Sequence, residues 1–136
     1  MTDKDKKVLV VSSFNTSSWD RYSKEFLDTL LDNWKDVDVA IYYDGASNDM
    51  LTPYKDRLDY VFNLDANENL QFFKNNNKER NGKEDNGAYN YRQDALKFSN
   101  KAFAIMDAYL EKDFKKKYEW IVWVYADTVT KKEFPK

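Results

Sequence analysis

Two acidic side chains each follow an apolar run of the sequence closely enough to take part in a ligand or metal site. Asp44 follows residues 37–43, and Asp127 comes two positions after residues 120–125. In open α/β sheets, ligands bind outside the carboxyl ends of the strands, and carboxylate oxygens there can hold Mg²⁺ or Mn²⁺. The alternative for each acid is a role in a turn, because Asp44 precedes a glycine and Asp127 a threonine.

Several kinds of chemistry are excluded by residues that the sequence lacks. The chain contains no cysteine and no histidine, which excludes disulfides, thiol nucleophiles, Cys-bound metal centres and Ser–His triads. Any metal would therefore be held by oxygen. The sequence has three glycines and no Gly-rich phosphate-binding motif, which argues against a dinucleotide-binding Rossmann domain and a P-loop NTPase.

The elements that would position these residues are indicated by alternating apolar runs and helical periodicities. Strands are predicted at 8–11, 37–43, 60–64 and 120–125, and helices at 19–34 and 93–112. A helical or irregular stretch is predicted near 53–58, and a long loop with one or two helical turns at 65–91. We therefore predict an α/β domain with a mainly parallel sheet, at whose carboxyl edge residues 12–18, 44–45 and 126–130 meet.

The apolar face of the last predicted helix and the four tryptophans supply the expected core. Helical spacing predicts that the helix at 93–112 buries Leu96, Ala102, Phe103, Ile105, Met106, Tyr109 and Leu110. The tryptophans are expected in the core or at an interface.

Composition and charge indicate one soluble domain over residues 1–136, of which 42% are hydrophobic. The formal net charge of -2 provides no field that would attract nucleic acid. No apolar segment resembles a signal peptide or is long enough to span a bilayer, so we expect a cytoplasmic protein. The many asparagines and lysines are typical of an AT-rich genome, such as that of a phage or a low-GC bacterium.

The stretch 91–130 carries a resemblance to a known family. It contains the pattern Arg-x-Asp-Ala-x-x-Phe-x-x-Lys, then a hydrophobic strand that ends in Tyr-Ala-Asp-Thr. It resembles the central stretch of GT-A-type glycosyltransferases, in which such a helix precedes a strand ending in a DxD motif. The first strand followed by Ser-Ser-Phe-Asn, and the second ending in Asp44, are similar to that family less specifically. The resemblance implies a Rossmann-like three-layer domain that binds a nucleotide-diphospho-sugar.

The resemblance also implies roles for individual residues, and these form a predicted nucleotide-sugar site of Phe14, Asn15, Asp44, Arg92, Asp94 and Lys101. Lys101 would meet the diphosphate, Arg92 and Asp94 the nucleotide or sugar, Asp44 the base or ribose, and the two loop residues the base. The alternatives are ordinary loop packing, a turn, and a solvated helix face; for Lys97, on the same face as Lys101, the solvated face is favoured.

The metal motif of the family maps onto Tyr125-Ala126-Asp127, so a tyrosine replaces its first acid. The resemblance implies Mn²⁺ or Mg²⁺ at Asp127, weakened by Tyr125, because Mg²⁺ is usually bound by one or two carboxylates plus phosphate oxygens. No catalytic residue is assigned.

The sequence therefore predicts an incomplete glycosyltransferase-like domain, because the acceptor-binding half of the family has no counterpart in it. It would be vestigial or one half of a split transferase, with metal-dependent sugar transfer if active. The alternative is a non-catalytic interaction protein that retains the fold, and self-association or a partner chain is expected. A receiver-like domain ranks last, because Ser12 and Ser13 stand where its acids would follow the first strand.

Overall fold

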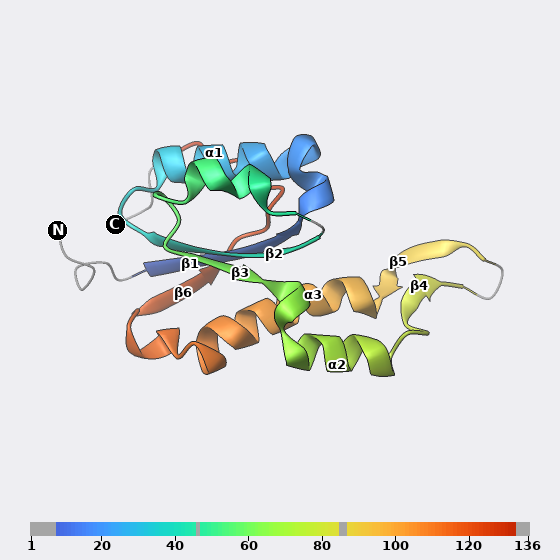
Figure 1. Cartoon of the computed structure of the whole chain (residues 1–136). Helices are drawn as coiled ribbons and strands as arrows, with labels where there is room; N and C mark the ends of the chain where they lie inside the picture. The colour runs from blue at the N-terminus through green and yellow to red at the C-terminus, as the bar shows by residue number, and fades with distance from the viewer. Residues whose placement is uncertain (1–7, 46, 85–86, 133–136) are drawn as a thin grey trace.

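The computed structural model describes residues 8–45, 47–84 and 87–132, with the backbone alone described at 91–93. At its centre lies a four-stranded, all-parallel sheet with the strand order β3-β2-β1-β6 (Figure 1). Its strands are β1 (Val8–Asn15), β2 (Asp38–Asp44), β3 (Tyr60–Asn63) and β6 (Trp120–Trp123). This sheet confirms the predicted α/β class and its parallel strands.

The two central strands are buried on both faces because their side chains alternate between two apolar clusters. In β1, Leu9 and Val11 belong to one cluster, whereas Val10 belongs to the other. In β2, Tyr42 and Ile41 are divided in the same way. Helices must therefore cover both faces of the sheet.

Three helices provide that cover and make a three-layer structure. Helix α1 (Lys24–Asn33) packs Phe26, Leu27 and Leu30 against one face. Helices α2 (Glu68–Asn76) and α3 (Ala95–Met106) lie on the opposite side of the sheet (Figure 1). A π-helical turn, Trp19–Ser23, precedes α1, so the helix predicted at 19–34 is present in two parts. Short 3₁₀ turns connect the elements at Thr16–Ser18, Asp49–Tyr54, Leu64–Ala66 and Phe114–Lys116.

The buried face of α3 differs from the prediction. Along α3 and the turn that continues it, Ala104 and Ala108 are fully buried, whereas Met106, Tyr109 and Leu110 are about half exposed. The two alanines let the helix approach the sheet closely. After Met106 the chain forms a π turn, Asp107–Glu111. Ala102, Met106 and Tyr109 lie at helical spacing on an exposed side, although all three were expected in the core. The sheet therefore packs against the small residues of this helix and not against its larger apolar ones.

The predicted loop at 65–91 is largely structured. Asn67 caps α2 by accepting a hydrogen bond from the Leu70 amide at 2.9 Å, and Leu70 is fully buried. An antiparallel hairpin follows, made of β4 (Asn81–Lys83) and β5 (Tyr89–Asp94). In this stretch Asn67 therefore serves as a helix cap.

The segment after β6 crosses back over α1. The Thr130 amide donates to Thr29 Oγ1 at 3.0 Å, and Asn33 Nδ2 donates to the Thr130 carbonyl at 3.0 Å. Trp34 Nε1 donates to the Lys132 carbonyl at 2.9 Å. Within the described ranges, no helix has the length and apolar character needed to cross a membrane.

Candidate functional site

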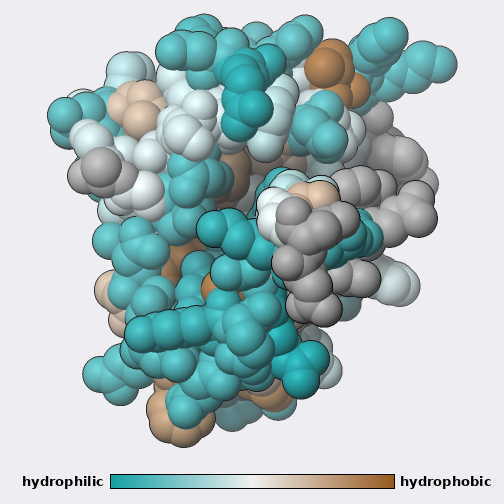
Figure 2. All heavy atoms as spheres, turned by 90° about the vertical axis from the view of Figure 1, so that its right-hand side faces the viewer, coloured by the Kyte–Doolittle hydropathy of each residue, from teal (hydrophilic) through white to brown (hydrophobic). Residues whose placement is uncertain are grey.

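An open pocket of about 490 Å³ lies at the carboxyl ends of β1, β2 and β6, where α3 begins. We call it the carboxyl-edge pocket; its charged, amide and aromatic lining includes Phe14, Asn15, Arg21, Tyr22, Asp44, Asp94, Lys97, Asn100, Lys101, Trp123 and Tyr125. Figure 2 shows the side of the molecule to which the strand ends point, with hydrophobic atoms visible in a hollow between largely hydrophilic upper and lower parts.

The pocket brings together five of the residues predicted for a nucleotide-sugar site, namely Phe14, Asn15, Asp44, Asp94 and Lys101. The parallel register of β1 and β2 aligns Phe14 with Tyr43 and Asn15 with Asp44, so the ends of both strands reach the same wall. Lys101 lies on α3, which packs against β1 on the same face of the sheet as α2.

Arg92 was the sixth residue predicted for that site, and Asp127 was the predicted metal ligand. The Arg92 backbone belongs to β5, but its side chain lies outside the described residues. Asp127 is exposed in a turn closed by the Thr128 amide on the Tyr125 carbonyl at 3.1 Å, and it is not part of the pocket wall.

An amide and a carboxylate form the polar end of the pocket. Asn15 Nδ2 donates to Asp44 Oδ2 at 3.0 Å, while Asn15 Oδ1 accepts from the Ser17 amide at 2.8 Å. Burial raises the pKa of the Asp44 carboxyl above its ordinary value, and the hydrogen bond from Asn15 offsets only part of that rise. The pair thus offers fixed carboxylate lone pairs to ligand hydroxyl or N–H groups.

A lysine held by aromatic rings also lines the pocket. Lys101 Nζ donates to the Tyr125 hydroxyl at 2.5 Å. The same ammonium lies 4.5 Å from the Tyr125 ring centroid and 5.7 Å from that of Trp123. Arg21 and Lys97 also line the pocket, so it offers three cations to an anionic ligand.

Two buried polar atoms of pocket-lining residues have no hydrogen-bond partner in the described part of the chain. They are Asn100 Oδ1 and Trp123 Nε1. Leaving a buried donor or acceptor unpaired costs free energy, so both atoms stand to gain from a ligand or a water. Helical spacing with Lys97 and Lys101 places Asn100 on the same face of α3. No sequence signal distinguishes Trp123 from the other tryptophans.

Asp94 has a structural part in the site. Its Oδ1 accepts from the Lys97 amide at 3.0 Å, which makes Asp94 the N-cap of α3. Its Oδ2 accepts from the Tyr89 hydroxyl at 2.6 Å. Asp94 therefore fixes where α3 begins at the pocket, in addition to facing it.

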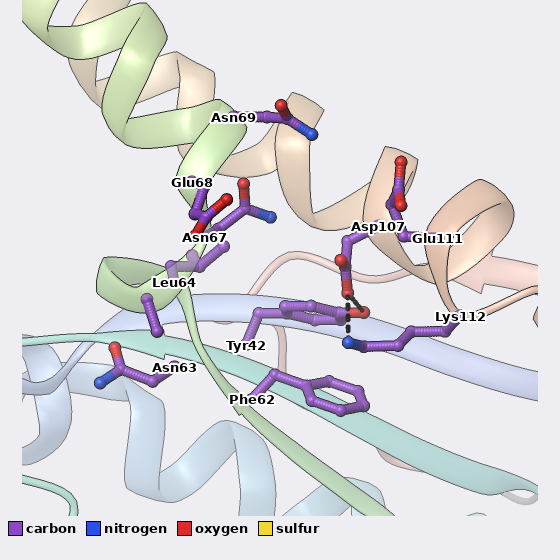
Figure 3. A pocket seen from close by; sticks show the side chains of 11 residues that line it. Tyr42, Phe62, Asn63, Leu64, Asn67, Glu68, Asn69, Asp107, Glu111 and Lys112 are labelled. Atoms are coloured by element: carbon purple, nitrogen blue, oxygen red, sulfur yellow. Dashed lines mark hydrogen bonds and ion pairs between the residues drawn. The ribbon is translucent and has the colours of Figure 1, made fainter.

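A second pocket, of about 420 Å³, lies where β2 and β3 meet α2 and the turn after α3 (Figure 3). Tyr42 donates from its hydroxyl to Asp107 Oδ2 at 2.6 Å, and Lys112 Nζ lies 3.9 Å from the same oxygen. Burial, followed by the hydrogen bond to Asp107, raises the pKa of Tyr42. Lys112 Nζ also lies 4.8 Å from the Phe62 ring centroid. These groups satisfy one another, which is typical of a structural polar cluster.

The donor atoms at the predicted metal motif do not by themselves fit Mn²⁺ or Mg²⁺. Of its two metal-binding positions only Asp127 is an acid, and Tyr125 carries a phenol whose oxygen accepts a hydrogen bond from the Lys101 ammonium. Across 8–45, 47–84 and 87–132, no three acidic side chains lie close enough together to hold a metal ion.

Comparison with known proteins finds no matching family model, curated protein or solved structure. The resemblance to GT-A-type glycosyltransferases thus remains a prediction from residues 91–130. Function is therefore inferred from the chemistry of the carboxyl-edge pocket.

Proposed function

We propose that the chain binds a nucleoside diphosphate sugar, through its nucleoside diphosphate part, in the carboxyl-edge pocket. The observation that supports this most is the convergence of Phe14, Asn15, Asp44 and Lys101 on one pocket at the carboxyl ends of parallel strands. Open α/β sheets bind ligands at that edge, and the volume of about 490 Å³ falls within the range of small-molecule sites.

Each part of such a ligand has a matching group in the pocket. Lys101, Lys97 and Arg21 supply positive charge for phosphate oxygens. Asp44, held by Asn15, accepts hydrogen bonds from ribose hydroxyls or base N–H groups. The aromatic side chains provide flat apolar surfaces for a base or a sugar ring. The proposal concerns binding, and we assign no catalytic residue.

Calorimetric titration with UDP and with GDP tests the proposal. Binding of either nucleotide is expected, and Asp44→Ala is expected to weaken it about tenfold, the loss of about 1.4 kcal/mol of hydrogen bonding to a charged group. Asp49→Ala removes an exposed acid outside the pocket and serves as the matched control. No binding of either nucleotide at millimolar concentration would contradict the proposal.

A second candidate is an interaction protein that pairs with another copy of itself. Large apolar side chains are exposed away from the pocket, with Phe72 at 72%, Trp120 at 66% and Leu110 at 51%, and β6 is the last strand at one edge of the sheet. Such surfaces mark interaction sites when they are contiguous. Light scattering over a concentration series tests this: a dimer that Trp120→Ser abolishes, without nucleotide binding, would favour the second candidate.

A further inference from the structure

We infer that Lys101 takes the place of a divalent cation in the carboxyl-edge pocket, so that a bound diphosphate is neutralised by this ammonium and binding needs no metal. The inference rests on the proposed function, because it names how the same pocket holds the charged part of its ligand.

The first observation is where the ammonium lies. Tyr125 stands at the position that the family resemblance assigns to the first metal-binding acid, and its hydroxyl accepts a hydrogen bond from Lys101 Nζ at 2.5 Å. The ring of the same tyrosine lies 4.5 Å from that nitrogen. A positive charge supplied by the chain is therefore already held at this position.

The second observation is that the charge is not neutralised by an acid. Elsewhere, Lys24 pairs with Asp28 at 2.6 Å and Lys116 with Asp113 at 3.0 Å. Lys101 forms no ion pair with any carboxylate of the described residues, although Asp44 and Asp94 line the same pocket. Its contacts are a phenol and two aromatic rings, which hold an ammonium in place without cancelling its charge.

The third observation concerns the donors that remain for a ligand. An ammonium has three N–H donors and no acceptor, and Tyr125 takes one of them. Two donors are left for phosphate oxygens. Because Tyr125 and Trp123 already restrict the lysine, less side-chain entropy is lost on binding than with a free surface lysine.

The remaining acid of the motif is poorly placed to bring in a metal. Asp127 is exposed and lies outside the pocket wall. A single carboxylate outside the wall is a poor match for Mg²⁺, which is usually bound by one or two carboxylates together with substrate phosphates. In this chain the Lys101 ammonium, in place of a metal ion, neutralises the negative charge of the phosphates.

The test compares UDP and GDP binding by calorimetry in EDTA and in Mn²⁺, with inorganic pyrophosphate titrated in EDTA alone. We expect the same nucleotide affinity, within about twofold, in both buffers, and pyrophosphate binding in EDTA. Lys101→Met is expected to weaken all of these about tenfold or more, since a charge-assisted hydrogen bond is lost. Lys115→Met, which removes an exposed lysine outside the pocket, is the matched control and should bind as the unchanged chain does.

The outcomes separate this inference from the proposed function. Nucleotide binding that requires Mn²⁺, or that Lys101→Met leaves unchanged, would overturn the inference and leave the proposed function standing. Pyrophosphate binding that depends on Lys101, without nucleotide binding, would support the ammonium site and overturn the nucleotide proposal. No binding of any probe would overturn both. Circular dichroism checks folding, and Lys101→Gln replaces the methionine variant if that variant does not fold.

Discussion

At the carboxyl end of β2, the geometry around Gly45 determines how Asp44 faces the pocket. Gly45 has a φ of +128°, and a Cβ at this position would lie 2.0 Å from Thr16 Oγ1. Asn15, next to Thr16 in the chain, donates a hydrogen bond to Asp44, and the Gly45 amide donates to Asp65 Oδ2 at 3.1 Å. The turn after β1 and the turn after β2 therefore lie so close together that only glycine fits between them.

Gly45→Ala is expected to lower the free energy of unfolding by roughly 1–3 kcal/mol, because it adds backbone strain and a steric clash. Nucleotide affinity should fall with it, since Asp44 is displaced. Gly87→Ala is the control: Gly87 has a φ of +85°, but a Cβ there would meet nothing within 4 Å. Urea unfolding of both variants makes the comparison, and equal losses of stability would show that the contact with Thr16 is unimportant.

Asp44 also predicts a pH dependence of stability. Burial raises its pKa in the folded chain, so ionised Asp44 costs folding free energy at neutral pH, and the cost disappears once the carboxyl is protonated in both states. Asp44→Asn keeps an acceptor for Asn15 and is expected to be more stable than the unchanged chain at pH 7. This advantage should shrink as the pH falls towards and below the ordinary carboxyl pKa.

Chemical unfolding of both proteins between about pH 3.5 and about 7, where carboxyl groups titrate, measures the difference in their free energies of unfolding. A stability advantage that grows towards low pH would contradict the prediction. The substitution also removes the carboxylate from the pocket, so nucleotide binding is measured separately from stability.

At the scale of elements, α3 connects the core with the pocket. Ala104 and Ala108 pack fully buried against the sheet, while Lys97 and Lys101 on the same helix line the pocket. Asp94 caps this helix and so determines where it starts. The two buried alanines determine how closely the helix and its continuation approach the sheet. The position of Lys101 thus depends on two small residues, Ala104 and Ala108, that are not part of the pocket wall.

Ala108→Leu is expected to lower the free energy of unfolding by about 1–3 kcal/mol, because a larger side chain does not fit between α3's continuation and the sheet. Ala102→Leu adds the same atoms at an exposed position of α3 and should change stability by about 0.5 kcal/mol or less. Urea unfolding measures both. Similar effects for the two variants would mean that the helix does not pack closely at Ala108.

Over the whole molecule, the segment after β6 connects the last described residues to α1. It crosses to α1, where Thr29 and Asn33 bind both backbone groups of Thr130. This connection joins parts of the chain about a hundred residues apart in sequence. The arrangement leaves Tyr125 and Trp123 at the pocket while Asp127 faces solvent.

Thr29→Val keeps the shape of the side chain but removes the acceptor for the Thr130 amide. We expect faster hydrogen exchange at Thr130 and a loss of about 1 kcal/mol of stability, the net value of one hydrogen bond. Thr52→Val, at an exposed site, is the control. Exchange measured by NMR tests this, and unchanged protection of the Thr130 amide would refute it.

Sequence alone was sufficient for the class of fold and for one side of the candidate site. Unbroken apolar runs and helical periodicities are local patterns, so they predicted the strands and the parallel sheet. The rule that ligands bind at the carboxyl ends of such strands brought residues 12–18 and 44–45 to one edge. The family resemblance named Phe14, Asn15 and Asp44 within those segments, and the structure places all three in one pocket.

The remaining features were decided by contacts between distant segments, which no local pattern contains. Packing against the sheet buried Ala104 and Ala108 and left Met106, Tyr109 and Leu110 about half exposed. The hairpin of β4 and β5 formed in a stretch with the composition of a loop. Arg21 and Trp123 line the pocket because elements far apart in sequence pack side by side. Asp127 is exposed outside the pocket wall, and the segment that follows it is bound by α1, an interaction whose free energy depends on both partners being in place.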